Sequence, residues 1–190
     1  SPRRYLLDKV LVDAAVEAGA ELREGFITEE LLWENGSVVG VRGRLKNGGT
    51  ATECAQMVIG ADGKHSLIAK SVEAARYDEQ PSLTCGYYSY WSGIETDGGE
   101  LSLNGKTGLL AFPTNDALTC VAVMRPLSDF GEFKGDLDTC FRRYAKGNLP
   151  AIGDQLDAAR REEKYVGTAE TQNYFRKPYG SGWALVGDAG

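Results

Sequence analysis

The spacing of apolar residues changes along the chain and predicts a helix followed by strands. Between residues 6 and 18, apolar positions recur every three or four residues, which is typical of one face of a helix. A short strand is expected at 20–26. Two further strand-like runs, 30–33 and 37–44, flank Asn35-Gly36, a pair that strongly favours a two-residue hairpin turn. The first quarter of the chain is therefore predicted to be a helix, a strand and a hairpin.

From residue 81 onward the pattern changes to longer strands rich in aromatic residues and threonine. Short turns separate these strands, so we expect an antiparallel sheet in which each strand forms a hairpin with the next. The strands are predicted at 83–94, 100–103, 108–112 and 118–124. Two helices are expected at 137–144 and 152–164, the first with Asp136 as its N-cap, and a last strand at 183–186.

Small residues, which are common in the first part of the chain, return only in the last predicted strand. This pattern predicts that the segment between these two parts is an inserted domain. Residues 80–163 are expected to form an inserted antiparallel-sheet domain, and 1–79 with 164–190 an outer unit. The expected fold class is α/β, more exactly described as α+β, because helices and strands are mixed and the inserted sheet is antiparallel.

Composition and charge exclude several classes of protein. With 42% hydrophobic and 25% charged residues, the 190-residue chain has the composition of a globular protein. The net charge is -6 and the basic residues are scattered, so no nucleic acid partner is expected. No apolar run approaches the roughly 20 residues of a membrane span. The cysteines are widely spaced and there is one histidine, so neither a metal site nor a disulfide scaffold is expected, and a cytoplasmic protein fits best.

The two ends of the chain suggest a piece of a longer protein. The sequence begins Ser1-Pro2 without methionine and stops at Gly190, directly after an apolar strand. A strand that ends in small residues and an aspartate normally leads into a helix whose N-terminus receives an anion or a ribose.

Two glycine-aspartate segments carry the candidate chemistry. In the first, Gly60 and Gly63 would let a ligand approach the backbone, Asp62 can accept hydrogen bonds, and Ser66 can cap the next turn. In the second, Asp188 follows a strand, where a carboxylate can hold a ribose hydroxyl. Either segment alone is more often ordinary turn chemistry than a functional motif. Their order, with Arg4 and its helix before them and a sheet between them, is more specific.

These residues resemble the FAD-dependent monooxygenases and related oxidoreductases with the para-hydroxybenzoate hydroxylase fold. The segment 60–66 looks like the DG motif of that family, and 187–189 looks like its GD motif. The resemblance implies that the outer unit is an incomplete FAD-binding domain. Carried over by position, the implied cofactor-binding residues are Arg4, Asp62, Gly63, Gly187, Asp188 and Ala189.

The chain departs from the family pattern in two places. Ala69 stands where the DG motif usually has arginine, with Lys70 beside it. The Gly-x-Gly-x-x-Gly unit that places the pyrophosphate at a helix N-terminus is absent. We therefore expect the isolated chain to lack tight FAD binding and turnover, and to self-associate through exposed apolar surface.

The resemblance implies that NAD(P)H reduces the FAD and that O2 supplies an oxygen atom to a small organic substrate. Such chemistry needs no protein nucleophile, and no catalytic residue or metal ligand is assigned. His65, the single histidine, is expected to be an ordinary turn residue.

Aromatic residues of the inserted sheet are the candidates for substrate contact. Strand periodicity places Tyr88 and Tyr90 on one face of the run 83–94, and Tyr87 and Trp91 on the other. These rings are also what a strand would use to pack against helices. Phe112-Pro113 is a further candidate, because a strand that ends in proline leaves main-chain groups available to a ligand.

Two alternatives to a monooxygenase remain open at this point. The first keeps the flavin but not the oxygenation, as in reductases and halogenases of the same fold. The second is a module that binds a ligand or protein on the sheet without any redox step.

Overall fold

The computed structural model describes residues 1–190 and divides into two compact units. We call Ser1–Ala18 with Pro81–Gln172 the sheet unit, and Gly19–Gln80 with Asn173–Gly190 the motif unit. Each unit has a hydrophobic cluster of its own. The assignment of 1–79 and 164–190 to a FAD-binding domain, and of 80–163 to a substrate domain, stays a prediction.

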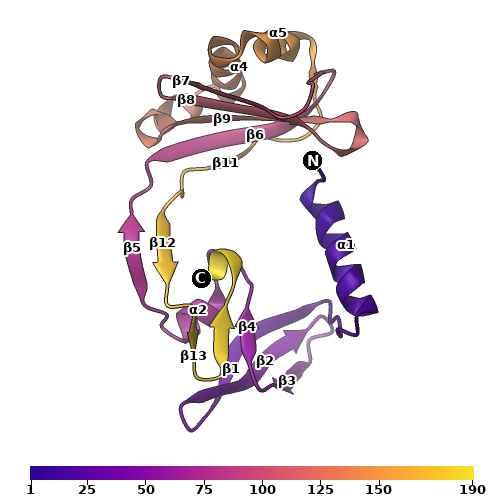
Figure 1. Cartoon of the computed structure of the whole chain (residues 1–190), viewed down its shortest axis with the longest axis vertical. Coiled ribbons are helices and arrows are strands. Elements are labelled where there is room, and N and C mark those ends of the chain that lie inside the picture. Colours follow the sequence, from indigo (N-terminus) through magenta and orange to yellow (C-terminus); the bar gives the residue numbers. More distant parts are fainter. The chain divides into compact units, whose positions relative to one another are not determined.

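The sheet unit is built on an antiparallel sheet, as the strand pattern predicted. Its strand order is β10-β6-β9-β8-β7, with β11 also paired to β6 (Figure 1). The strands are β6 (Thr84–Ser92), β7 (Glu100–Asn104), β8 (Thr107–Pro113), β9 (Thr119–Pro126), β10 (Arg160–Arg161) and β11 (Val166–Thr168).

The expected succession of hairpins is wrong at one point. β6 pairs with β9 and not with β7, in a register that runs from Thr84 opposite Pro126 to Trp91 opposite Thr119. The long β6–β9 ladder places Trp91 in the core together with Val121, whereas β7 is a short edge strand with exposed leucines. Burial of the larger apolar surface therefore decides which strands are neighbours.

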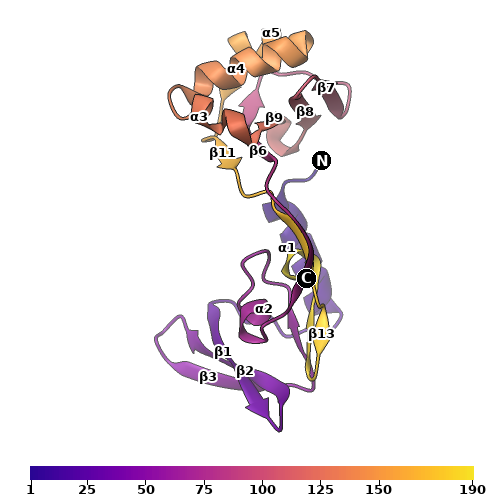
Figure 2. The same cartoon turned by 90° about the vertical axis from the view of Figure 1, so that its left-hand side faces the viewer.

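Helices cover one face of this sheet (Figures 1 and 2). They are α3 (Phe130–Phe133), α4 (Leu137–Asn148) and α5 (Pro150–Ala158). Asp136 caps α4 as predicted, because its carboxylate accepts the Thr139 N–H at 3.1 Å. The expected second helix, 152–164, is too long. It ends at Ala158, since Arg160–Arg161 forms strand β10 on the edge of β6.

The N-terminal helix α1 (Arg4–Glu17) confirms the predicted helix, and none of its residues is buried. Ion pairs one turn apart, Arg4–Asp8 at 2.9 Å and Lys9–Asp13 at 2.7 Å, support it along its exposed surface. The strand expected at 20–26 is not formed, because regular strand pairing begins only at Phe26.

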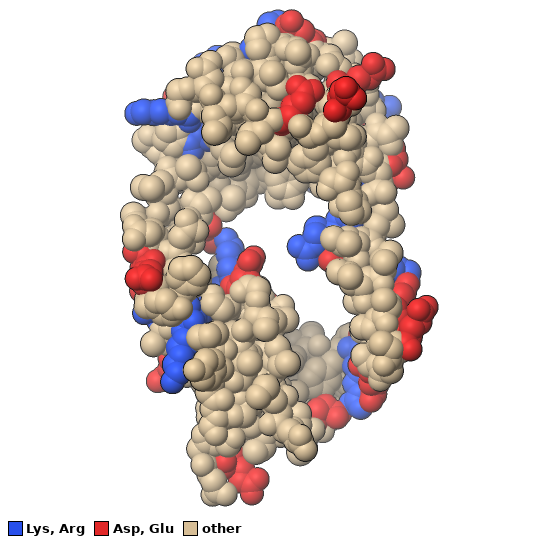
Figure 3. Space-filling view, in the orientation of Figure 1, with Lys and Arg blue, Asp and Glu red and all other residues tan.

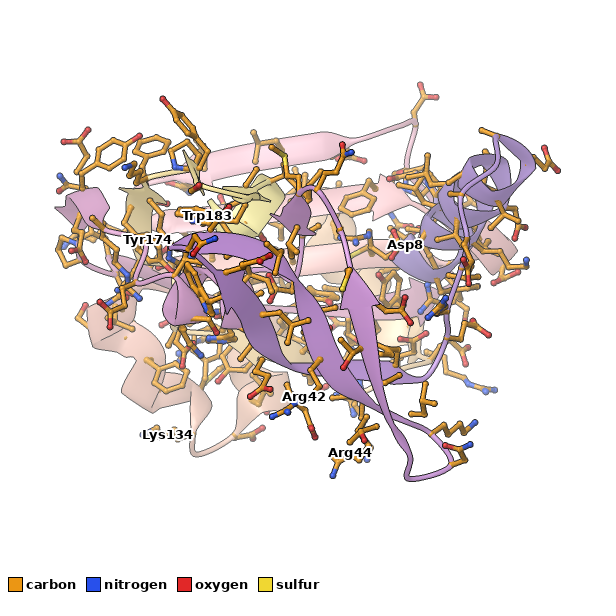
Figure 4. All side chains as sticks on the ribbon, turned by 90° about the horizontal axis from the view of Figure 1, so that it is seen from below. Asp8, Arg42, Arg44, Lys134, Tyr174 and Trp183 are labelled. Atoms are coloured by element: carbon orange, nitrogen blue, oxygen red, sulfur yellow. The ribbon has the colours of Figure 1, made fainter.

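In the motif unit, an antiparallel sheet contains β1 (Phe26–Glu34), β2 (Ser37–Leu45) and β3 (Thr50–Cys54). The predicted hairpin is confirmed. Asn35 and Gly36 both have positive φ, 50° and 79°, as a two-residue hairpin turn requires. Figure 4 labels Arg42 and Arg44 on β2, which form ion pairs with Glu30 and Glu29 of β1.

A smaller sheet of the same unit contains β4 (Val58–Gly60), β13 (Tyr179–Gly180) and β14 (Trp183–Leu185). Helix α2 (Leu67–Ser71) follows β4, and its buried residues Ile68 and Ala69 join Trp183 and Leu185 in the core. A separate ribbon pairs β5 (Arg76–Gln80) with β12 (Asn173–Arg176). This ribbon was not predicted from the sequence, because β5 is exposed throughout and lacks an alternating apolar pattern.

Charged residues of both signs are interspersed over the face drawn in Figure 3. None of the helices combines the length and the apolar character that a membrane crossing requires.

Candidate cofactor-binding site

The parallel pairing of β4 with β14 brings the two glycine-aspartate segments together. Val58 lies opposite Trp183 and Gly60 opposite Leu185, and the two strands run side by side in Figure 1. The Val186 N–H donates to the Gly60 carbonyl at 2.9 Å, which extends the ladder to the carboxyl ends of both strands. The segments that follow, with Asp62-Gly63 on one strand and Gly187-Asp188 on the other, therefore start from the same edge of the sheet.

A glycine at position 60 allows helix α2 to pack closely on these strands. A Cβ there would lie 2.9 Å from Ile68 Cβ and 2.9 Å from Leu185 Cδ2, closer than packed carbon atoms approach. From the sequence alone, Gly60 was expected to allow close approach of a ligand. The structure gives it an internal reason, namely the contact between α2 and the strand pair.

The Asp62 carboxylate is used within the protein. Its Oδ2 accepts the N–H groups of Leu67 at 2.7 Å and Ile68 at 3.4 Å, at the start of α2. Burial raises the pKa of Asp62, but hydrogen bonds from the Ser66 side chain and from backbone N–H groups outweigh burial, so the pKa lies below its ordinary value. Ser66 caps α2 as predicted, since its Oγ accepts the Ala69 N–H at 2.9 Å. Asp62 thus fixes the shape of its own loop.

The Asp188 carboxylate differs from that of Asp62. It lies in a short 3-10 turn, Gly187–Ala189, is exposed, and has no hydrogen bond or ion pair to another residue. Gly187 before it has a φ of 60°, and Ala189 after it is buried and anchors the turn. Gly63, in the neighbouring segment, has a φ of 76°. A Cβ at Gly63 or Gly187 would meet nothing within 4 Å, so both glycines leave open space beside the backbone.

One residue at this site was not predicted from the sequence. Arg176, at the end of β12, is 3% exposed and contacts both segments. Its Nη1 donates to the Ala189 carbonyl at 2.9 Å, and its Nη2 donates to the Lys64 carbonyl at 3.2 Å. An arginine followed by Lys177-Pro178 has no local signal that distinguishes it from a surface residue, because its partners are 13 and 112 residues away.

Arg4, the remaining predicted cofactor residue, begins α1 in the sheet unit. Its guanidinium pairs with Asp8, one turn along the helix. The role of Arg4 toward a cofactor stays a prediction.

Three of the predicted substrate residues, Tyr88, Tyr90 and Phe112, lie on the face of the sheet opposite to the helices, whereas the register places Pro113 in one row with Thr119 and Trp91 on the helix-covered face. Tyr87 and Trp91 pack into the helix-covered core, which confirms the alternation, while Tyr88 and Tyr90 point the other way with ring centroids 6.0 Å apart. The ladder places Phe112 in one row with Tyr90, through Cys120 between them. We call this side of the sheet the open face, because α3, α4 and α5 lie on the other side; on it the Arg3 guanidinium packs on the Tyr90 ring, with its carbon 4.0 Å from the ring centroid, and Cys120 is buried. Pro113 ends β8 and is exposed.

A hollow of about 230 Å³ lies beside Tyr88 in the sheet unit. No charged side chain lines it, and its wall includes Gly86, Ala122, Met124 and Val166. Such a lining favours an uncharged, apolar ligand group.

Comparison with known proteins agrees with this reading of the chain. Residues 4–127 match the model of a family described as FAD binding domain. A curated relative, digeranylgeranylglycerophospholipid reductase 2 of Methanothermobacter thermautotrophicus, is 37% identical over 95 residues, which are 50% of this chain and 24% of that protein.

Solved structures have the same fold at low sequence identity. The flavin-dependent brominase Bmp2 superposes with a TM-score of 0.86 and 18% identity, over 100% of this chain and 49% of that one. The myxobacterial chondrochloren halogenase CndH superposes with a TM-score of 0.85 and 23% identity, over 98% of this chain and 45% of that one. A flavoprotein/dehydrogenase from Cytophaga hutchinsonii superposes with a TM-score of 0.80 and 17% identity, over 96% of this chain and 46% of that one.

The chain thus spans about half the length of the solved structures that it resembles. The family match covers most of the chain and includes Arg4, Asp62, Gly63 and the open face of the sheet. Together with the fold, it establishes that this chain belongs to the FAD-binding domain family and has the fold of the para-hydroxybenzoate hydroxylase-like flavoproteins.

Proposed function

We propose that this chain is part of an FAD-dependent oxidoreductase that uses NAD(P)H and O2 to oxidise a small organic substrate. The observation that carries the proposal is the parallel pairing of β4 and β14, which starts the Asp62-Gly63 and Gly187-Asp188 segments from one sheet edge. Ligands of α/β sheets bind at the carboxyl ends of such strands.

The residues present at this edge fit a dinucleotide. The exposed Asp188 carboxylate has no partner within the chain, so it can accept hydrogen bonds from ribityl or ribose hydroxyls. The open space at Gly63 and Gly187 lets a ligand approach the backbone. In this proposal Asp188 binds the cofactor, Gly187 and Ala189 hold its carboxylate in place, and Asp62 with Gly63 shapes the facing loop.

The bound flavin would supply the transfer of electrons between NAD(P)H and the second substrate. In a monooxygenase reaction, NAD(P)H, H⁺, O2 and a substrate C–H bond are consumed. The products are NAD(P)⁺, water and a C–OH bond. In this proposal the residues of this chain position the reactants, and none of them is assigned as a nucleophile or a base.

The open face would hold the organic substrate through Tyr88, Tyr90 and Phe112, and Pro113 would border it at the end of β8. The adjacent hollow has no charged lining residue, which supports an uncharged substrate with an apolar group of moderate size. A charged group in that hollow would lose its hydration without gaining a partner.

A reductase is the second candidate, supported by the curated relative, whose name is that of a reductase. A halogenase is a third, since the structures of similar fold include a brominase and a halogenase. The three reactions differ in their use of O2 and halide, which makes them separable in one assay.

The test uses the full-length protein, purified and examined for visible flavin absorbance before and after addition of FAD. NADH and NADPH are then added without air, followed by air, uncharged aromatic compounds and bromide. Flavin uptake, reduction by NAD(P)H, and O2 consumption with a hydroxylated product are expected. Substrate reduction without O2 would favour the reductase, and a brominated product the halogenase. A protein that takes up no FAD would contradict the proposal and favour a binding module without redox activity.

A further inference from the structure

Arg176 is the one charged residue among the buried side chains, and no part of the proposed chemistry uses it. It ends β12 in the motif unit, close to Tyr174, which Figure 4 labels on the same strand. Burial of a charged group is costly unless hydrogen bonds or an opposite charge compensate for it. The contacts of Arg176 therefore indicate what its position achieves.

The guanidinium of Arg176 connects three groups. Nη1 donates to the Ala189 carbonyl at 2.9 Å, and Nη2 donates both to the Lys64 carbonyl at 3.2 Å and to Tyr174 Oη at 3.0 Å. The Tyr174 hydroxyl in turn donates to the same Lys64 carbonyl at 3.4 Å. Two side chains of one strand thus converge on the loop after β4, and one of them also reaches the turn after β14.

No carboxylate forms an ion pair with Arg176, so neutral groups alone compensate for its charge. Its guanidinium carbon lies 4.8 Å from the centroid of the Tyr174 ring, a distance at which a cation interacts favourably with an aromatic face. Hydrogen bonds that involve a charged donor are stronger than those between neutral groups. The arrangement fixes two backbone carbonyls firmly relative to each other.

This connection joins the two segments beyond the ends of their strands, where packing of Ala189 against the cluster that contains Ile68 and Ala69 is the other link. The ladder between β4 and β14 ends with the bond from Val186 N to Gly60 O, before either loop begins. Beyond it lie Gly63 and Gly187, both with positive φ, and glycine is the residue with the greatest backbone freedom. Only Arg176 donates hydrogen bonds to both loops.

We propose that Arg176 is a positioning residue that sets the separation between the loop of Gly63 and the turn of Asp188, and through it the affinity for FAD. The proposal rests on the FAD site proposed above. It adds the residue that holds the loop of Gly63 and the turn of Asp188 at a fixed separation. Lysine cannot replace it fully, because a single ammonium group cannot present two nitrogens in one plane to two carbonyls.

The test compares Arg176→Met and Arg176→Lys with wild type in the full-length protein. Arg125→Met serves as the matched control. Arg125 is also an arginine of low exposure that packs on a tyrosine ring, but it lies in the sheet unit and pairs with Asp129. Three quantities are measured: the FAD dissociation constant, the melting temperature without FAD, and amide hydrogen exchange of residues 61–67 and 186–190 without FAD.

We expect Arg176→Met to raise the FAD dissociation constant by about tenfold or more, consistent with the loss of charge-assisted hydrogen bonds. Exchange in both loops should become faster. Arg176→Lys should fold and give intermediate values. Arg125→Met should lower the melting temperature without changing either FAD affinity or loop exchange.

Wild-type affinity and wild-type loop exchange in Arg176→Lys would overturn the proposal, as would a loss of affinity in Arg125→Met equal to that in Arg176→Met. If wild type itself takes up no FAD, the proposed function fails. Amide exchange of the two loops then tests the structural role of Arg176 separately. Faster exchange in Arg176→Met supports its role in holding the loops, and unchanged exchange contradicts that role.

Discussion

At the scale of single residues, the two aspartates of the site have different surroundings and should respond differently to mutation. Asp62 accepts two N–H groups of α2, whereas Asp188 has no partner in the chain. We expect Asp62→Ala to lower the free energy of unfolding by about 1 kcal/mol, as for the loss of a helix cap. Asp188→Ala should leave stability unchanged and weaken FAD binding.

Thermal unfolding and FAD titration of both variants check this division of roles. Equal losses of stability in the two variants would contradict it, because Asp188 would then have a structural partner.

Because the pKa of Asp62 is lowered in the folded protein, the loss of stability expected for Asp62→Ala should depend on pH. Hydrogen bonds hold its pKa in the folded protein below the ordinary value of 3.8, so its carboxylate stabilises the folded state above that pH. This contribution is lost as the pH falls through the pKa of the folded state. The difference in unfolding free energy between wild type and Asp62→Ala should therefore shrink below about pH 4, as measured by urea unfolding between pH 3 and 7. A constant difference over this range would contradict the prediction.

The cysteines provide a residue-scale test of the open face. Burial raises the pKa of the Cys120 thiol to about 11, while Cys54 is exposed. Thiolate is the reactive form, so at pH 8 Cys120 should react with iodoacetamide at least about 100-fold more slowly than Cys54. Mass spectrometry of peptides sampled over time measures both rates. Equal rates would contradict the burial of Cys120, which is 4% exposed in the structure.

At this scale, sequence patterns predicted most residues of the candidate site, and their role toward a cofactor stays a prediction. Asp188 and Gly63 were predicted as site residues from the local order of glycine, aspartate and strand. Arg176 could not be, because its importance arises from carbonyl groups brought to it by folding. The internal use of Asp62 was missed for the same reason, since its partners are N–H groups of a helix that the sequence only suggested as a turn.

At the scale of elements, the contact between α2 and the β4–β14 pair depends on Gly60. We expect Gly60→Ala to lower the free energy of unfolding by about 1–3 kcal/mol, because the added Cβ meets Ile68 and Leu185 at 2.9 Å. It should also weaken FAD binding, since α2 would be displaced. Gly131→Ala, where a Cβ meets nothing within 4 Å, is the control. A stable Gly60→Ala protein with unchanged affinity would contradict this description of the site.

Local signals predicted elements well and their partners less well. The hairpin at Asn35-Gly36 needed only its turn residues and the two flanking strands. The order of strands in the large sheet, the ribbon of β5 and β12, and the early end of α5 depend on pairing between residues far apart in sequence. No periodicity within a single segment contains that information.

At the scale of the whole molecule, the two units have separate cores, so core mutations should act within one unit. Ile152→Val, in the core of the sheet unit, should speed amide exchange of 81–172. Val38→Ala, in the core of the motif unit, should speed amide exchange of 19–80 and 173–190. Each change should cost about 1 kcal/mol or somewhat more. Exchange that rises equally in both units with either variant would contradict the division.

The central claim is that the segments after β4 and β14 together bind FAD, and amide hydrogen exchange with and without FAD tests it most directly. The full-length protein is used, at an FAD concentration that saturates any change in flavin fluorescence. The account predicts that FAD protects residues 61–67 and 186–190 more strongly than β1, β2 and β3 of the same unit. FAD binding that leaves both segments unprotected would contradict it.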